Sequence, residues 1–312
     1  MRIVFFGTPD FAVASLKALV ENGKDIVAVV TASDKPAGRG HKVKFPPVKD
    51  FALSQKIDVL QPANLKDTVF IERLRSYKAD LQIVVAFRML PEVVWDMPVL
   101  GTYNVHASLL PDYRGAAPIN WAIINGEAET GITTFKLKHE IDTGSILLQQ
   151  RVRISKNETA GELYQRLMNV GAELLVKSVE MIEKGSISLT PQNTDGKVKH
   201  APKLFKADGK INSAIPAKEL HDFVRGMSPF PGAYLKVRCN DREEVWKIHK
   251  TKLTDAQALN QTGFKHENGC LLLAASDFWI EITEIQAEGK RKMNAVDFIN
   301  GLRCDLQAVE VL

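Results

Sequence analysis

The sequence predicts an α/β domain built around a mostly parallel sheet, followed by a smaller domain made mainly of β-strands. The chain has 312 residues, of which 45% are hydrophobic and 25% charged, and this is enough for two globular cores. In the first part of the chain, apolar strand-like runs alternate with amphipathic helical stretches. After a polar stretch that contains two prolines, runs with period-two alternation follow.

The first part of the chain repeats the order strand, turn, helix. Residues 2–6 form an apolar run that ends at Gly7, and apolar residues at helical spacing follow Pro9. The order recurs, so we expect strands at 25–31, 57–60, 81–87 and 102–106, and helices after Pro47 and around 65–76. Such alternation is typical of a mostly parallel sheet with both faces covered by helices.

The pattern changes after the last of these strands. Residues 132–137 and 145–154 look like two antiparallel strands joined by a turn. The longest predicted helix follows them. A T-x-x-E capping box at Thr159 and Glu162 opens this helix, and Gly185 ends it.

A polar stretch around Pro191 indicates a linker. Beyond it we expect a short helix and then strands of an antiparallel barrel or sandwich, at 217–225, 232–239, 244–253, 269–275 and 278–286. We therefore divide the chain into a first domain, a linker and a second domain, at 1–189, 190–206 and 207–312.

The cysteines and the hydropathy pattern limit the class of protein. Cys239, Cys270 and Cys304 lie far apart and show none of the Cys and His spacing of a zinc site, so we expect three free thiols and no metal. The N-terminus lacks the long apolar stretch of a signal peptide, and no segment has the length of a membrane span. We expect a cytoplasmic protein that does not contact a membrane.

Basic residues gather in two places. The net charge of +4 is small, and acidic and basic side chains are equal in number over residues 206–312, so the excess lies earlier in the chain. Each cluster alone is typical of a solvated loop, but two in turn-forming surroundings favour a polyanionic partner. The clusters are Lys35, Arg39, His41, Lys42, Lys44 and Lys49, and Lys197, Lys199, His200, Lys203, Lys206 and Lys210.

Two motifs resemble known sites without completing them. The first strand-to-helix turn, GTPDFA, carries only Gly7 of the three glycines that bind a dinucleotide, so we do not expect a nicotinamide cofactor. The triplet Asp142-Thr143-Gly144 occurs in aspartic proteases, which need two such carboxylates. A single copy in an α/β setting does not favour a protease.

The stretch NVHASLLPDYRGAAP places an amide and an imidazole at the end of a predicted strand. Asn104 and His106 are two residues apart, so both should point to the same side. In parallel α/β sheets, ligands bind beyond the carboxyl ends of the strands. The ends of the strands at Gly7, Thr31, Phe87 and His106 therefore predict one ligand-binding crevice.

These side chains suit acyl-type transfer. A histidine can accept and donate a proton near neutral pH, and an amide can donate to an oxygen that gains negative charge. Asp142 is the best candidate for the carboxylate that holds the imidazole. Ser108 does not lie in a G-x-S-x-G elbow, so a substrate amine is the better nucleophile. A structural histidine and a strand-end cap are the alternatives, but the three residues together favour a site.

Four motifs resemble the methionyl-tRNA formyltransferases. The NVHASLLPDYRGAAPI stretch is similar to the whole group of folate-dependent formyltransferases, whereas GTPDFA and PAGRG narrow the resemblance to the tRNA enzymes. The resemblance covers nearly the whole chain. The motifs lie at 7–12, 34–42, 104–119 and 141–144.

The resemblance implies a Rossmann-like α/β catalytic domain and a smaller OB-like β-barrel domain. It implies transfer of formyl from 10-formyltetrahydrofolate to the methionine α-amino group of initiator methionyl-tRNA, with Asn104, His106 and Asp142 catalytic. The folate would contact Ser108, Leu109, Leu110 and Pro111, and its pterin would contact Phe87, Met89 and Leu90. The tRNA would contact Arg39, Lys35, Lys42, Lys44, Lys203 and Lys206. We expect a monomer.

Two features depart from the family pattern. Arg88 and Met89 replace small or aliphatic residues, so Arg88 either points outward or lies near the carboxylates of the folate tail. The near-neutral second domain shifts the expected phosphate contacts toward the PAGRG loop and the linker. Rival functions are formylation of a nucleotide-sugar amine or a purine precursor, hydrolysis of the formyl donor, and RNA binding without catalysis. The PAGRG loop and the second domain disfavour small-molecule formylation and hydrolysis of the formyl donor. The presence of Asn104, His106 and Asp142 together disfavours RNA binding without catalysis.

Overall fold

The computed structural model describes residues 1–37, 42–194 and 196–312, and it divides into two compact units. The N-terminal unit consists of 1–115, 130–152 and 164–200, and the C-terminal unit of 116–129, 153–163 and 201–312. The contacts thus assign two short pieces of the first half of the chain to the C-terminal unit. We retain the linear division at 1–189, 190–206 and 207–312 as a proposal about folding domains.

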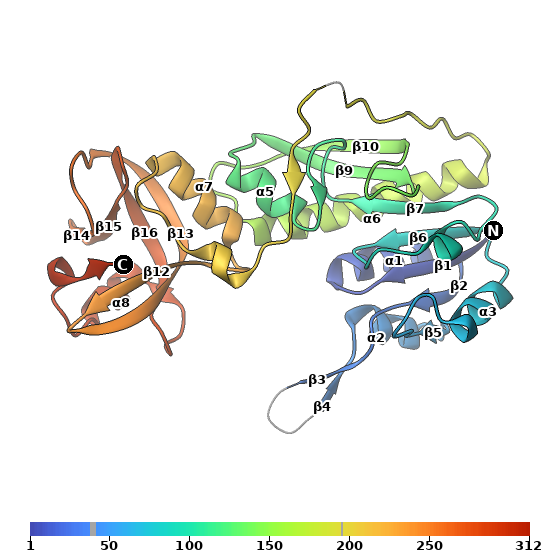
Figure 1. The fold of residues 1–312 in the computed structure, drawn as a ribbon, viewed down its shortest axis with the longest axis horizontal. Helices are drawn as coiled ribbons and strands as arrows, with labels where there is room; N and C mark the ends of the chain where they lie inside the picture. The colour runs from blue at the N-terminus through green and yellow to red at the C-terminus, as the bar shows by residue number, and fades with distance from the viewer. Residues whose placement is uncertain (38–41, 195) are drawn as a thin grey trace. The chain divides into compact units, whose positions relative to one another are not determined.

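A seven-stranded sheet forms the centre of the N-terminal unit (Figure 1). Five neighbouring strands pair in parallel, in the order β7, β6, β1, β2 and β5. Strand β9 pairs antiparallel with β7, and β10 forms the edge beyond β9. In spatial order the strands are β10 (Ile146–Arg153), β9 (Glu129–Lys136), β7 (Thr102–His106), β6 (Leu81–Val85), β1 (Arg2–Gly7), β2 (Asp25–Val30) and β5 (Val59–Leu60). The expected mostly parallel sheet is confirmed.

Helices cover both faces of this sheet because consecutive residues of its central strands β1 and β6 are apolar and buried, so each face carries apolar side chains. Val4 and Phe6 of β1 belong to a core cluster with Phe70 and Leu74, whereas Phe11 packs edge-on against Tyr164, with ring centroids 5.3 Å apart. The helices of this unit are α1 (Asp10–Glu21), α2 (Pro47–Ser54), α3 (Thr68–Ser76), α4 (Glu92–Trp95) and most of α6 (Ala160–Glu183).

The predicted capping box opens α6. The backbone N–H of Thr159 donates to Glu162 Oε2 at 2.9 Å, and the N–H of Glu162 donates back to Thr159 Oγ1 at 3.3 Å. The N–H of Thr159 and, more weakly, its hydroxyl donate to the Glu162 carboxylate and lower its pKa. The short strands β3 (Lys35–Ala37) and β4 (Lys42–Lys44) form a separate antiparallel pair.

A curled antiparallel half-barrel forms the core of the C-terminal unit, consistent with the expected OB-like fold. Trp246 is fully buried at its centre, with ring centroids 5.4 Å from Phe264 and 4.8 Å from Phe298. The strands are β12 (Ala233–Cys239), β13 (Arg242–Gln257), β14 (Phe264–Glu267), β15 (Cys270–Ala274), β16 (Phe278–Gln286), β17 (Met293–Asn294) and β18 (Glu310–Val311). The helices are α5 (Pro118–Ile124), α7 (Ala217–Met227) and α8 (Ala295–Asn300).

The prediction of three free thiols is wrong for two cysteines. Cys239 and Cys304 form a disulfide with a Cα–Cα distance of 6.1 Å, and only Cys270 is free. The two residues are 65 positions apart in the sequence, which hides their proximity. Pairing of Val237 in β12 with Val311 in β18 brings the chain end back beside Cys239. Among the described residues, no helix combines the length and the apolar character that a membrane crossing needs.

Candidate active site

The predicted polar pair lies at the carboxyl end of β7, near the middle of the sheet. Asn104 pairs in register with Val84 of β6 and Phe135 of β9, and it is half-buried. No hydrogen bond of the Asn104 side chain occurs among the described residues. His106 follows two residues later and is 6% exposed. The amide of Asn104 therefore remains available to a ligand.

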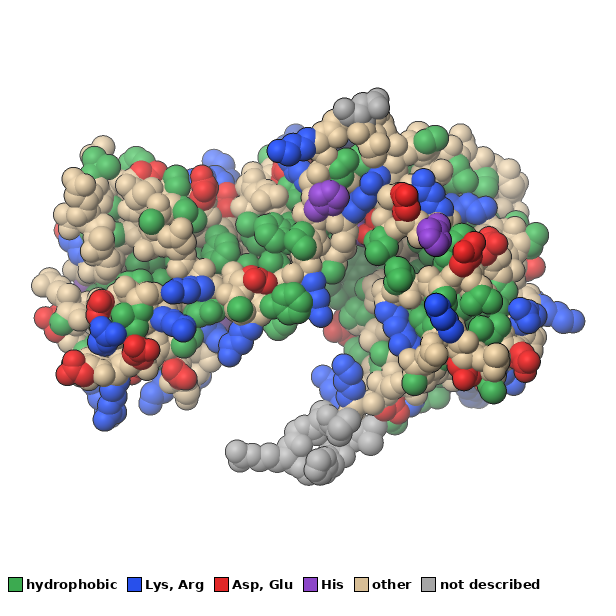
Figure 2. All heavy atoms as spheres, viewed as in Figure 1, with side chains coloured by type: hydrophobic (Ala, Val, Ile, Leu, Met, Phe, Trp, Pro, Cys, Tyr) green, Lys and Arg blue, Asp and Glu red, His purple; other side chains and the backbone are tan. Residues whose placement is uncertain are grey.

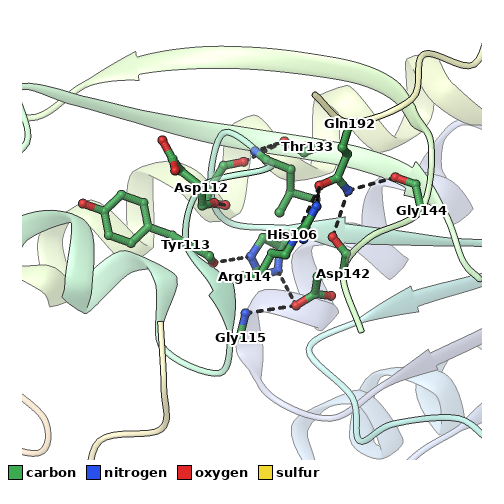
Figure 3. A network of polar contacts seen from close by, with 11 residues as sticks. His106, Asp112, Tyr113, Arg114, Gly115, Thr133, Asp142, Gly144 and Gln192 are labelled. Atoms are coloured by element: carbon green, nitrogen blue, oxygen red, sulfur yellow. Dashed lines mark hydrogen bonds and ion pairs between the residues drawn. The ribbon is translucent and has the colours of Figure 1, made fainter. Parts of the chain in front are cut away.

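The contacts of His106 fix its tautomer (Figure 3). Its Nε2 lies 2.8 Å from the carbonyl oxygen of Tyr113. A carbonyl only accepts, so Nε2 carries a hydrogen and donates it. Its Nδ1 faces Asp142, at 3.8 Å from Oδ2. The Tyr113 carbonyl thus orients the ring, and Nδ1 is the nitrogen that can gain or lose a proton beside Asp142.

Asp142 lies in the turn between β9 and β10, held by backbone groups. Its Oδ2 accepts from the N–H of Gly115 at 3.1 Å, and its backbone has a φ of 54°, in the left-handed region. At Gly144 a Cβ would lie 1.7 Å from the carbonyl oxygen of Lys136, so only glycine fits there. The turn brings Asp142 to His106, as the sequence suggested for the carboxylate.

Segment 108–111 is held by hydrogen bonds from Thr133 of β9 and Gln149 of β10, two residues that the sequence does not single out. The N–H of Leu110 donates to Thr133 Oγ1 at 3.2 Å, and Thr133 donates to the carbonyl of Ser108 at 2.7 Å. Gln149 donates to the carbonyl of Leu110 at 2.8 Å. The Ser108 hydroxyl is fully buried and donates to the carbonyl of Asp112 at 2.6 Å, so it is not presented to a ligand.

The segment after β6 carries side chains with different environments. Phe87 packs edge-on against Phe6, with centroids 5.7 Å apart, and Leu90 is buried in the core. Met89 is 72% exposed. Arg88 donates to the carbonyls of Pro62 at 2.5 Å and Ala63 at 3.0 Å, so its guanidinium holds the chain after β5.

The predicted tRNA-binding residues fall into two sets. Lys35 and Lys44 are exposed partners across β3 and β4, whereas Arg39 and the side chain of Lys42 lie outside what the structure describes. Lys203 and Lys206 are exposed in the C-terminal unit. Figure 2 shows lysine and arginine side chains spread over the visible faces of both units.

Lys206 lines a cavity of about 410 Å³ on the outer side of the C-terminal half-barrel. Lys236 and Lys247 lie on its wall with Tyr234, and in the described parts of the chain the three lysines have no ion-pair partner. One carboxylate, of Glu288, also lines the cavity, and its Oε2 accepts from the N–H of Val245. We call Lys206, Lys236 and Lys247 the lysine face.

No group of three or more His, Cys, Asp or Glu side chains that could hold a metal ion occurs within 1–37, 42–194 and 196–312. The polar side chains of the candidate site are the carboxamide of Asn104 and the imidazole of His106 on β7, and the carboxylate of Asp142 in the turn beside them. This set can stabilise an oxyanion and exchange a proton.

Comparison with known proteins identifies the family. A family model described as "Formyl transferase" matches residues 1–179, and one described as "Formyl transferase, C-terminal domain" matches 203–303. The methionyl-tRNA formyltransferase of Bacteroides fragilis is 46% identical over 314 residues, which covers 96% of this chain and 95% of that protein. The one of Flavobacterium johnsoniae is 44% identical and covers 97% and 96%.

Solved structures share the fold at low sequence identity. A sugar 3N-formyl transferase, crystallised in the presence of dTDP and 5-N-formyl-THF, has a TM-score of 0.69 at 21% identity and covers 93% of this chain and 99% of that one. HypX from Aquifex aeolicus, in complex with tetrahydrofolic acid, has a TM-score of 0.64 at 18% identity and covers 98% and 48%. Given two matched family models and relatives 46% identical over nearly the whole chain, the chain belongs to the methionyl-tRNA formyltransferase family.

Proposed function

We propose that the protein transfers the formyl group of 10-formyltetrahydrofolate to the α-amino group of methionine on initiator methionyl-tRNA. The observation that carries this proposal is the contact of His106 with Asp142 beside the unengaged amide of Asn104, in a chain of this family. The folate derivatives in the two solved relatives support the choice of formyl donor. We further propose that the protein acts as a monomer in the cytoplasm.

In the proposed mechanism, the unprotonated amine of methionine attacks the formyl carbon. A bond forms between this nitrogen and the carbon, and Asn104 donates to the oxygen that gains negative charge. His106 Nδ1, beside Asp142, takes the proton from the attacking nitrogen. The bond from carbon to the folate nitrogen then breaks, and the same proton passes to that leaving nitrogen. His106 Nε2 stays bound to the Tyr113 carbonyl throughout.

The folate would bind along the strand ends, between segments 87–90 and 108–111. The hydroxyl of Ser108 and the side chains of Leu90 and Leu110 are buried. We therefore propose that these three residues contribute to folate binding through their backbone groups and by shaping the binding surface. The side chains of Leu109, Pro111 and Phe87 are half-buried and that of Met89 is exposed, so these can contact the ligand directly.

The tRNA would bind through Arg39, Lys35, Lys42 and Lys44 of the PAGRG loop and through Lys203 and Lys206. The lysine face supports a phosphate contact on the C-terminal unit, because its ammonium groups outnumber the single carboxylate at the cavity. This adds Lys236 and Lys247 to the residues expected to meet the tRNA backbone.

The decisive experiment measures transfer of labelled formyl from 10-formyltetrahydrofolate to methionyl-tRNA. The wild-type chain should label charged initiator tRNA, and His106→Ala should not. Nucleotide-sugar amines, a purine precursor and water are offered as competing acceptors. Labelling of one of these in place of methionyl-tRNA would reject the proposed substrate, and RNA binding without transfer would favour a non-enzymatic protein.

A further inference from the structure

Segment 190–200, which the sequence predicts as part of a linker, has residues near both of its ends that contact the candidate site or the strand beside it. At its start, Thr190 exchanges two backbone hydrogen bonds with Ile146, at 2.8 and 2.9 Å. Near its end, the carbonyl of Lys199 accepts from the N–H of Tyr113 at 2.7 Å, and the N–H of Lys199 donates to Asp112 Oδ1 at 3.0 Å. The start of the segment is therefore fixed to β10, directly after the turn that carries Asp142, and its end to the residues that follow segment 108–111.

Gln192 uses its whole amide within this segment (Figure 3). Its Nε2 donates to the carbonyls of Asp142 and Gly144, each at 2.8 Å. Its Oε1 accepts from Arg114, at 3.1 Å from Nε and 2.5 Å from Nη2. One half-buried side chain thus joins the turn that carries Asp142 to the residue beside Gly115, whose N–H binds the Asp142 carboxylate.

The turn needs such support because Asp142 has an unfavourable backbone conformation. A residue other than glycine keeps a left-handed backbone conformation only where its surroundings hold it there. The donations from Gln192 satisfy the carbonyls on both sides of Thr143 and fix the position of the carboxylate.

We propose that Gln192 is a positioning residue that holds Asp142 beside Nδ1 of His106. The inference rests on the proposed function only for its kinetic consequences, since the contacts themselves are independent of the substrate. The alternative is that Gln192 only fastens the segment to the sheet. The two roles differ in whether the effect of a substitution passes through Asp142.

The first test is Gln192→Glu, which keeps the acceptor for Arg114 and removes both donations to the turn. We expect kcat to fall by roughly 10- to 100-fold, the loss typical of a misplaced catalytic group. KM for methionyl-tRNA and for the formyl donor should stay unchanged. In an Asp142→Asn background, the same change should cost less than about twofold more, because its effect passes through the missing carboxylate.

Asn120→Asp is the matched control. Asn120 also donates its amide hydrogens to two backbone carbonyls, of Gly226 at 2.8 Å and Phe230 at 3.2 Å, but within the C-terminal unit. This variant should lower the melting temperature and leave kcat unchanged in both backgrounds. If Gln192→Glu behaves like this control, or if its loss of kcat multiplies fully with that of Asp142→Asn, the positioning role is rejected.

A second readout does not depend on activity. The N–H of Gly115 donates to the Asp142 carboxylate, so its hydrogen exchange reports where the carboxylate lies. In Gln192→Glu, exchange at Gly115 should accelerate while the core amides of β1 stay protected. Unchanged protection of Gly115 would overturn the inference. If the wild-type chain transferred no formyl group, the proposed function would fail, and this exchange measurement would still decide the role of Gln192.

Discussion

The proposed catalytic cluster of Asn104, His106 and Asp142 and the lysine face are built in opposite ways. In the proposed catalytic cluster the side chains are buried or half-buried, and Tyr113 and Gly115 fix the imidazole and the carboxylate through backbone groups. On the lysine face, Lys206 and Lys236 are exposed and Lys247 is half-buried, and none has an ion-pair partner in the described ranges.

This difference shows how each region can act on a substrate. Buried groups with fixed partners act at short range in a medium of low dielectric constant, so one removal has a large effect that salt barely changes. Exposed ammonium groups act over about the screening length, roughly 8 Å at physiological ionic strength. Their effects are small, additive and sensitive to salt.

The largest effect should follow Asn104→Ala. Loss of one oxyanion donor lowers turnover by roughly 10²- to 10³-fold. Because Asn104 makes no side-chain hydrogen bond within the described chain, the fold should be unaffected and folate binding largely retained. Steady-state kinetics at two salt concentrations would check this. Turnover near that of the wild type, or a loss that varies strongly with salt, would contradict the assignment.

Thr133→Val should have the next largest effect, on segment 108–111, which we propose as the folate edge of the cluster. The change keeps the shape but leaves the N–H of Leu110 and the carbonyl of Ser108 without their partner. Such a loss costs roughly 1–3 kcal/mol of stability. KM for the formyl donor should rise while kcat changes little. Thr133→Ser keeps the hydroxyl and serves as the control, and equal KM values for the two variants would refute the prediction.

Much of the fold could be predicted from periodicity and turn chemistry. The strand at 102–106 and the strand at 278–286 have the predicted bounds, and α6 begins with its predicted capping box. The strand predicted at 81–87 ends earlier, at Val85, because Ala86 takes a φ of 48° that no local pattern announces. Helix α5 does not follow from the apolar spacing of its 7 residues, and its contact with α7 is visible only in the fold.

For the candidate site, the sequence predicts the positions of side chains but not of the backbone groups that orient them. The strand-end rule placed Asn104 and His106, but not the Tyr113 carbonyl that orients the imidazole, since any residue has a carbonyl. The importance of Gln192 depends on contacts with a turn 50 positions away. From the sequence, Arg88 could point outward or lie near the carboxylates of the folate tail. In the structure its guanidinium donates to the carbonyls of Pro62 and Ala63, which no sequence pattern indicates.

Single substitutions on the lysine face should have smaller effects. Lys236→Ala and Lys247→Ala should each weaken methionyl-tRNA binding modestly and reduce the slope of log affinity against log salt by about 1. Arg39→Ala in the PAGRG loop should do the same. Lys252→Ala is the control, because this lysine lies outside the cavity and 4.0 Å from Glu281. A salt slope unchanged in all the first three variants would remove the lysine face and the loop from the tRNA interface.

The smallest effect should come from replacing the buried His221 in the C-terminal unit. This substitution tests whether a buried polar group affects stability in the C-terminal unit as well as in the N-terminal one. Burial lowers the pKa of His221 below its ordinary value of 6.5, although the carbonyl of Lys156 opposes this. Burial also lowers the pKa of His249. Below pH 6.5 the unfolded chain therefore binds protons that the folded chain does not, and the free energy of unfolding falls as pH falls toward the folded pKa values.

Urea unfolding above and below pH 6.5 would measure this dependence. His221→Gln should reduce the loss of stability on acidification without abolishing it, because His249 still titrates. His266→Gln is the control, since it removes an imidazole that is exposed on β14. If His221→Gln and His266→Gln gave the same pH dependence as the wild type, burial of His221 would not contribute. The contrast between fixed and exposed groups would then hold only in the N-terminal unit.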